Sequence, residues 1–85
     1  MANVEIYSTA ICPYCTMAKQ LFDRKGVEYT EIRVDLEPAK RQEMMQKSKQ
    51  RTVPQIFINN EAIGGYTDLV AIDREQRLDS LLSKV

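Results

Sequence analysis

The 85-residue chain contains no histidine and no tryptophan, and it has only two cysteines, three glycines and three prolines. Without histidine, the sequence excludes a Cys-His protease or transferase site. A structural zinc site needs about four ligands, so two cysteines would require carboxylates or a second copy of the chain to complete it. The chain also shows no repeat, linker or low-complexity segment.

Net charge and long apolar runs are lacking as well. Twelve Lys and Arg residues balance twelve Asp and Glu residues, so no net field favours a nucleic-acid or anionic-membrane partner. The basic residues between Lys40 and Arg51 are interrupted by Glu43 and Met44, which is typical of a solvated helix face. No stretch approaches the length of a membrane span, and the first residues do not resemble a secretion signal. We therefore expect a cytoplasmic protein that binds neither nucleic acid nor membrane.

Length and composition predict one domain spanning residues 1–85. A chain this short can bury only about 60 to 65% of its unfolded surface, around a single core. Hydrophobic residues make up 44% of the chain and charged residues 28%, as expected of an ordinary folded domain.

Hydrophobic patterning predicts an α/β fold. The expected order is a strand over residues 4–7, a helix from 12 or 13 to 26, a strand over 29–35, a helix over about 38–47, a hairpin of 55–58 and 61–63, and a helix capped by Thr67 that runs through Asp73 and somewhat beyond. Met44 and Met45 are expected to face the core, and Leu78, Leu81 and Leu82 to close it. The order βαβ then ββα predicts a parallel pair joined by a crossover helix, followed by an antiparallel hairpin.

The two cysteines lie three residues apart at the start of the first predicted helix. Residues three apart share a helix face, so Cys12 and Cys15 can approach closely enough to bond. Cys12 faces the free backbone N–H groups of the helix start, whose partial positive charge stabilises a thiolate, and it is the expected nucleophile. Cys15 is expected to be less accessible and to attack the mixed disulfide intramolecularly.

Two other roles for this pair are disfavoured. A structural disulfide would close a very short loop in a chain that shows no secretion signal. A metal site would lack ligands, so we expect no metal.

The chain carries three short motifs: Cys-Pro-Tyr-Cys at 12–15, Thr-Val-Pro at 52–54 and Gly-Gly-Tyr-Thr-Asp at 64–68. Together they resemble the dithiol glutaredoxins, most closely small bacterial members, and the resemblance covers nearly the whole chain. It implies a thioredoxin-like fold with a four-stranded mixed sheet flanked by helices. It also implies that glutathione is the co-substrate and that Cys12 and Cys15 reduce protein disulfides and glutathione mixed disulfides.

Carried over by position, the resemblance implies that Thr52, Val53 and Pro54 form one glutathione-binding segment. Pro54 would be cis, and the backbone of Val53 would pair with the cysteinyl unit of glutathione. Taken alone, Pro54 would be read as a trans residue opening an edge strand, because only about 5 to 6% of X-Pro bonds are cis.

The resemblance places the γ-glutamyl end of glutathione at Gly65, Thr67 and Asp68. Backbone N–H groups at a helix start would receive its carboxylate, and the Asp68 carboxylate would receive its ammonium group. The same residues also suit a helix start without any ligand, through a Thr67 cap and an acidic first turn.

Two further contacts are implied. Tyr14 would form a wall for the glutathione backbone, with a plain surface aromatic as the alternative. Arg41 would reach the glycine carboxylate, although Lys40 and Arg51 are comparable and all three could be solvated.

This sequence departs from the family pattern at two positions. Many relatives carry Lys where this chain has Thr9, so we expect weaker glutathione binding or a less depressed pKa of the Cys12 thiol than in those relatives. Some relatives carry an additional cysteine where this chain has Tyr66, so no third thiol is present.

The resemblance further implies a monomer that acts on disulfide-bonded or glutathionylated client proteins, with ribonucleotide reductase among them. A thioredoxin reduced by a flavoprotein is disfavoured, because that family usually carries a Trp before its first active-site cysteine. An iron-sulfur carrier, with two copies sharing a cluster through Cys12 and glutathione, is disfavoured by Pro13.

Overall fold

The computed structural model describes residues 2–83, which alternate between strands and helices. The elements are β1 (Val4–Ser8), α1 (Pro13–Arg24), β2 (Thr30–Arg33), α2 (Pro38–Ser48), β3 (Gln55–Ile58), β4 (Glu61–Gly64), α3 (Tyr66–Arg74) and α4 (Leu78–Ser83). The expected order of strands and helices is therefore confirmed as far as α3.

The four strands form one mixed sheet in the order β2-β1-β3-β4. β1 runs parallel to β2 and antiparallel to β3, and β3 runs antiparallel to β4. The turn between β3 and β4 uses Asn59 and Asn60, both with positive φ, as the sequence predicted. Both central strands, β1 and β3, thus pair with a neighbouring strand on each side.

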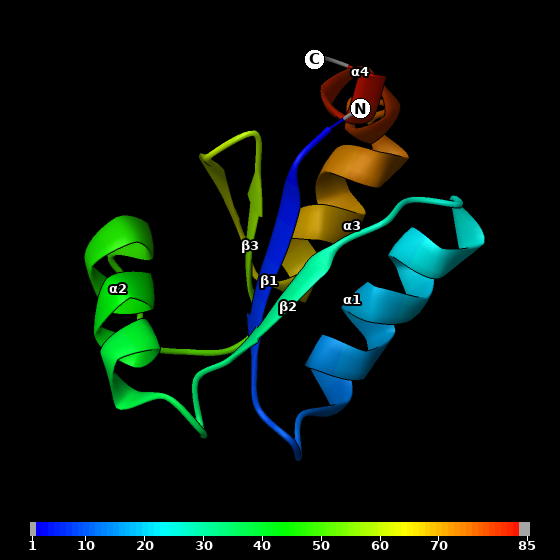
Figure 1. Ribbon diagram of the computed structural model, residues 1–85. Coiled ribbons are helices and arrows are strands. Elements are labelled where there is room, and N and C mark those ends of the chain that lie inside the picture. The colour runs from blue at the N-terminus through cyan, green and yellow to red at the C-terminus, as the bar shows by residue number, and fades with distance from the viewer. Residues whose placement is uncertain (1, 84–85) are drawn as a thin grey trace.

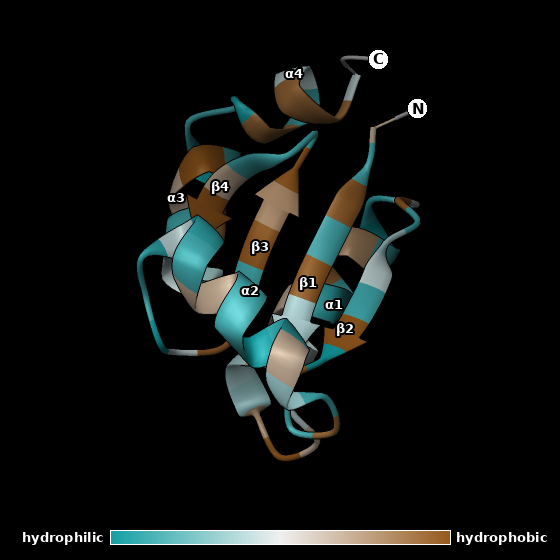
Figure 2. Ribbon diagram, turned by 60° about the vertical axis from the view of Figure 1, so that its left-hand side comes forward, coloured by the Kyte–Doolittle hydropathy of each residue, from teal (hydrophilic) through white to brown (hydrophobic). Residues whose placement is uncertain are grey.

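Helices cover both faces of this sheet. Figure 1 shows α1 and α3 on one side and α2 on the other. Side chains of a strand alternate between faces, so Ile6 and Ile56 pack toward α1 and α3, whereas Tyr7 and Phe57 pack toward α2. Figure 2 shows brown and teal bands along β1, and a largely hydrophilic α2.

The larger core lies under α1 and α3. It is built from buried residues of the central strands and of three helices: Val4, Ile6, Ala18, Leu21, Phe22, Ile56, Ile58, Leu69 and Leu78. Leu81 and Leu82 pack against it, which confirms the closing role predicted for the C-terminal leucines. They do so from a short helix of their own, α4, that the sequence did not predict.

The smaller core holds α2 to the opposite face through apolar and polar contacts. Met44 is fully buried beside Tyr7 and Phe57, and Met45 packs against the same cluster, as predicted. The Tyr7 hydroxyl donates a hydrogen bond to Glu43 at 2.7 Å and accepts one from Lys47 at 3.0 Å. Burial and the Glu43 carboxylate together raise the pKa of Tyr7.

Two predicted boundaries were wrong. β2 was expected over residues 29–35 but ends at Arg33, because Asp35 turns its carboxylate back onto the Arg33 guanidinium in the turn that follows. Thr67 does not cap α3. The N-cap is Gly65, and the Asp68 side chain accepts the Gly65 N–H at 2.9 Å, so the helix begins at Tyr66.

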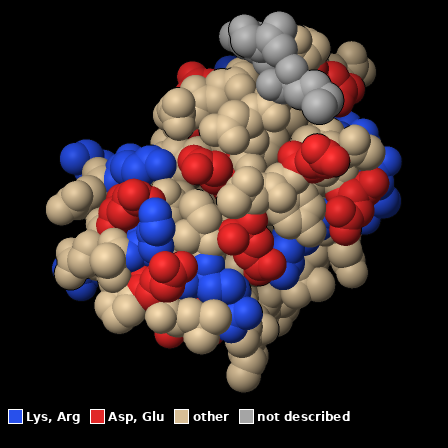
Figure 3. Space-filling model, viewed as in Figure 1, with Lys and Arg blue, Asp and Glu red and all other residues tan. Residues whose placement is uncertain are grey.

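Charge is evenly distributed over the visible surface. Figure 3 shows Lys and Arg interleaved with Asp and Glu on this face, without a patch of one sign. Within residues 2–83, no helix has the length and apolar character needed to cross a membrane.

Candidate functional site

The predicted site residues gather at one edge of the sheet. β1 ends there and β3, being antiparallel to β1, begins there. Three segments therefore meet at that edge: the loop and first turn of α1, the loop before β3, and the start of α3.

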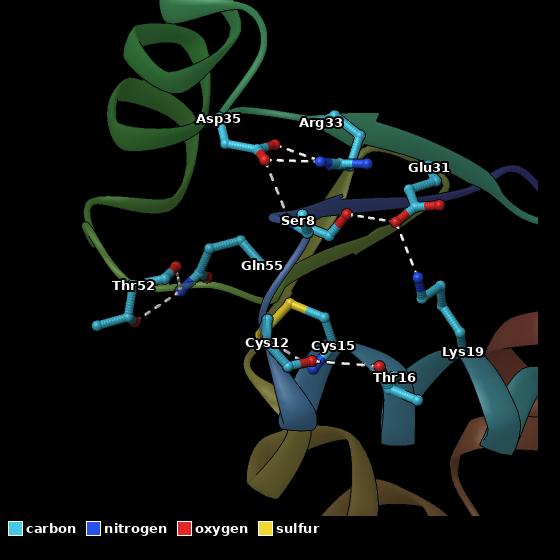
Figure 4. The surroundings of a disulfide bond; sticks show 11 residues. Ser8, Cys12, Cys15, Thr16, Lys19, Glu31, Arg33, Asp35, Thr52 and Gln55 are labelled. Carbon is cyan, nitrogen blue, oxygen red and sulfur yellow. Dashed lines mark hydrogen bonds and ion pairs between the residues drawn. A yellow bond between two sulfur atoms is a disulfide. The ribbon is translucent and has the colours of Figure 1, made fainter.

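Cys12 and Cys15 form a disulfide at the start of α1, with Cα atoms 5.2 Å apart (Figure 4). Cys12 is the N-cap and Pro13 the first helical residue, which agrees with the predicted start at residue 12 or 13. The backbone N–H of Cys15 points at the Cys12 sulfur, 3.1 Å away. Cys15 is 1% exposed, whereas Cys12 is partly exposed and follows Ile11, which is 93% exposed. Solvent and large molecules can therefore reach Cys12 much more readily than Cys15.

The loop that precedes Cys12 is held by Asp35. Its carboxylate accepts the Ala10 N–H at 3.2 Å and forms a two-pronged ion pair with Arg33 (Figure 4). The Arg33 guanidinium lowers the pKa of Asp35 to about 2. The carboxylate therefore stays ionised, and able to hold this loop, throughout the ordinary pH range.

A second polar cluster fixes α1 against the sheet beside the disulfide. Ser8, at the end of β1, is fully buried and donates to Glu31 of β2 at 2.6 Å, and Lys19 of α1 binds the same oxygen at 2.9 Å. The hydrogen bonds from Ser8 and from Lys19 lower the pKa of Glu31. One carboxylate thus joins two strands and the helix that carries the cysteines.

The loop before β3 is held from inside by Gln55. This buried side chain donates to the Thr52 carbonyl at 2.9 Å and also contacts the Thr52 hydroxyl and the Gln50 side chain. The Val53–Pro54 peptide bond is cis, which confirms the geometry implied by the resemblance. Val53 is therefore presented at the surface by a loop with several internal hydrogen bonds.

Two glycines shape the start of α3. Gly64 has a φ of +113°, which disfavours any side chain, and a Cβ there would collide with the Asp68 carboxylate. One oxygen of that carboxylate accepts the Gly65 N–H. The Gly-Gly pair therefore allows the chain to turn sharply from β4 into α3 with Asp68 folded back over the turn.

These segments enclose a groove of about 280 Å³. Its walls are Tyr14, Thr52, Val53, Pro54, Gly65, Tyr66 and Thr67. The rings of Tyr14 and Tyr66 stack with centroids 5.9 Å apart, so they join the start of α1 to the start of α3.

The two cysteines are not among the residues that line this groove, and neither are two of the predicted glutathione-binding residues. Asp68 lies at its end, engaged with Gly65. Arg41 lies on the exposed face of α2, and its guanidinium reaches the Arg51 carbonyl at 3.4 Å, next to the loop that carries Val53.

Sequence reasoning missed Gln55, Asp35 and the ring of Tyr66 as parts of the site. A glutamine opening an otherwise apolar strand, Gln-Ile-Phe-Ile, was a signal that its side chain serves a polar partner. Asp35 and Tyr66 gave no such signal, because the contact of Asp35 with the Ala10 N–H and the stacking of Tyr66 on Tyr14 both join residues that are distant in the sequence. Across residues 2–83, no three His, Cys, Asp or Glu side chains lie close enough together to hold a metal ion.

A model of the glutaredoxin family matches residues 4–63 of the chain. The chain is 52% identical over 82 residues to "Glutaredoxin 3" of Escherichia coli K12, covering 96% of this chain and 99% of that protein. It is 51% identical over 83 residues to a glutaredoxin of Pseudomonas aeruginosa, covering 98% and 99%.

Solved structures give the same result. A buckwheat glutaredoxin-glutathione complex superposes with a TM-score of 0.89 at 33% identity, covering 96% of this chain and 77% of that chain. The solution structure of a Brucella melitensis glutaredoxin superposes with a TM-score of 0.85 at 46% identity, covering 100% and 95%.

Proposed function

The chain belongs to the glutaredoxin family, and from that membership we propose a role in catalysis for each residue of its site. The chain is a glutathione-dependent thiol-disulfide oxidoreductase that works through the Cys-x-x-Cys pair at 12–15. We assign the nucleophile to Cys12 and the resolving thiol to Cys15. The partly exposed Cys12 and the buried Cys15 on one helical turn carry this assignment.

Cys12 acts first. The orphan N–H groups at the start of α1 stabilise its thiolate, and the Cys15 N–H, 3.1 Å from the sulfur, is the one aimed at it. The thiolate attacks one sulfur of a client disulfide, forms a mixed disulfide with that half and releases the other half as a thiolate.

Cys15 acts second. It loses its proton, attacks the Cys12 sulfur and releases the reduced client, which leaves the Cys12–Cys15 disulfide seen here. A first glutathione thiolate then opens this bond to a Cys12–glutathione mixed disulfide. A second attacks the glutathione sulfur, so that oxidised glutathione leaves and both cysteines are reduced.

Glutathione occupies the groove in an extended form. The backbone of Val53, presented by Thr52 and cis-Pro54, pairs with its cysteinyl unit, because main-chain hydrogen bonds bind any extended peptide. The α3 N-terminus at Gly65 and Thr67 receives the γ-glutamyl carboxylate.

Side chains complete the glutathione site. The Asp68 oxygen not bonded to Gly65 receives the γ-glutamyl ammonium group. Tyr14 walls the groove, and Arg41, at the far end of the loop, attracts the glycine carboxylate.

The clients are disulfide-bonded and glutathionylated proteins, and we include ribonucleotide reductase among them. The residues 1–85 act as a single domain and a monomer. The protein works in the cytoplasm, where glutathione is abundant and thiols are kept reduced.

Two single substitutions test the division of labour. Cys12→Ser is expected to abolish reduction of both a protein disulfide and a glutathionylated peptide. Cys15→Ser is expected to lose the disulfide reaction but to keep deglutathionylation, because that reaction needs only Cys12 and free glutathione. Steady-state rates with glutathione and glutathione reductase measure both reactions.

The assignment fails if Cys12→Ser keeps either activity, or if Cys15→Ser loses both while remaining folded. Alkylation of the reduced protein with a limiting reagent provides a control. Only the Cys12 sulfur should react at first, since Cys15 is buried.

A further inference from the structure

A second depression lies on α3 and adjoins the glutathione groove. Its volume is about 340 Å³, and its walls are Tyr66, Thr67, Val70, Ala71 and Arg74. Tyr66 and Thr67 line both depressions, so the two are neighbours on the surface. Neither the assigned chemistry nor the glutathione groove uses the remaining three residues.

The far end of this depression carries a single unneutralised charge. Arg74 forms no ion pair or hydrogen bond with any of residues 2–83. Both acidic neighbours along the chain are engaged elsewhere, Asp73 with Lys25 at 2.8 Å and Glu75 with Arg77 at 3.2 Å. A ligand in this depression therefore meets the apolar side chains of Val70 and Ala71 and then an available guanidinium.

The dimensions suit a short stretch of extended polypeptide. Thr67 and Arg74 are seven positions apart on one helix, which corresponds to about 10 Å at 1.5 Å per residue. An extended chain advances about 3.3 Å per residue, so about three residues span the distance from the start of α3 to Arg74.

We propose that this depression binds the client polypeptide on the N-terminal side of its reacting cysteine, and that Arg74 selects clients with an acidic residue there. The inference rests on the proposed function. A client cysteine bound to Cys12 takes the place of the cysteinyl unit of glutathione beside Val53. The residues before it then follow the γ-glutamyl direction to Thr67 and continue along α3, which puts the residue about four positions before the cysteine beside Arg74.

This geometry separates the two reactions of the enzyme. In disulfide reduction the client itself occupies the groove, so the residues before its cysteine contact α3. In deglutathionylation, glutathione occupies the groove and the client departs as the leaving thiolate. Selectivity for an acidic residue therefore belongs to the first reaction and is absent from the second.

The test uses short peptides that carry Glu or Lys about four residues before their only cysteine, with that cysteine in a mixed disulfide with thionitrobenzoate. Reduced protein attacks the peptide sulfur and releases coloured thionitrobenzoate, the better leaving group. A second peptide pair carries the same exchange about four residues after the cysteine. The variant is Arg74→Glu, and the matched control is Arg77→Glu, an exposed arginine outside the depression.

We expect the wild-type protein to favour the first Glu peptide over its Lys partner by about two- to fivefold, the range of an exposed ion pair. Arg74→Glu should reverse the preference and Arg77→Glu should retain it. Added salt should reduce it in the wild type, which tests the electrostatic origin without any substitution. The second peptide pair should show no preference between Glu and Lys, and neither should the first pair when it is glutathionylated.

The inference is overturned if the wild type shows no preference, if the preference survives in Arg74→Glu, or if the second peptide pair shows it equally. In those cases the proposed function stands as long as the glutathionylated peptides are reduced. Wild-type protein that reduces no glutathionylated peptide instead overturns the proposed function itself.

Discussion

The substitution Tyr7→Phe removes one hydroxyl oxygen from the sheet face under α2 and should measurably lower the free energy of unfolding. In Tyr7→Phe the ring stays buried against Phe57, but Glu43 and Lys47 lose the hydroxyl that joins them. A hydrogen bond to a charged group contributes about 1.5 to 3 kcal/mol when water is excluded. Here the Glu43 and Lys47 side chains are 41% and 35% exposed and regain water when the hydroxyl is removed. We therefore expect a loss of only about 1 to 2 kcal/mol.

That loss corresponds to a fall in Tm of roughly 4 to 15 °C for a domain of this size. Urea denaturation followed by circular dichroism measures the free energy of unfolding. The matched control is Tyr29→Phe, which removes the same atom from a partly buried tyrosine whose hydroxyl has no hydrogen-bond partner among residues 2–83. Its effect should stay within about 0.5 kcal/mol.

The pH dependence of this loss has a definite sign. The Tyr7 hydroxyl lowers the pKa of Glu43 below its usual value of 4.5. A carboxylate with a depressed pKa in the folded state stabilises the fold above its unfolded pKa, and that contribution disappears as the pH falls through the folded value. The difference between wild type and Tyr7→Phe should thus be constant above about pH 5.5 and shrink below the usual pKa of a glutamate. Equal stability of Tyr7→Phe and Tyr29→Phe at neutral pH would refute the reasoning, as would a difference that grows in acid.

Gly64→Ala should cost about 1 to 3 kcal/mol of stability in urea, because its Cβ meets a carboxylate at a positive φ; an unchanged midpoint would contradict the strain. Asp35→Ala should speed hydrogen exchange of the Ala10 amide severalfold, as seen by NMR, whereas exchange at wild-type rate would show that the carboxylate does not hold the loop. Thr9→Lys should lower both the pKa of the Cys12 thiol and the KM for glutathione; titration of thiolate absorbance checks the first and steady-state kinetics the second.

Local patterns were sufficient to predict most of the fold. Three of these patterns determine the structure only of residues close to them in the sequence. They are the apolar stripe of α1, the proline at its first position and the asparagines between β3 and β4. The errors arose where a particular side-chain contact, which patterns of hydrophobicity and propensity do not encode, decides a boundary. β2 ends early because Asp35 is drawn to Arg33 and to the Ala10 N–H, and α3 begins early because Asp68 folds back onto Gly65.

The site was predictable to a similar degree and for the same reason. Cys12 and Cys15 are neighbours on one helical turn, so their asymmetry follows from helix geometry, and their difference in exposure agrees with it. The cis bond before Pro54 came only from resemblance to a family, since the sequence by itself favours trans. The role of Gln55 could not be predicted without the structure, because its side-chain amide donates a hydrogen bond to the Thr52 carbonyl inside the loop before β3.

The site forms where three chain segments meet at one edge of the sheet, and this affects both the synthesis and the unfolding of the enzyme. During synthesis the thiols of Cys12 and Cys15 emerge long before residues 52–54 and 64–68 are made. The nascent chain therefore carries both thiols without the groove that selects their reaction partner. Truncated fragments should accordingly form disulfides without selectivity. In a denaturant titration, turnover should vanish at the same midpoint as the sheet itself, because no smaller piece of the molecule contains a complete binding site.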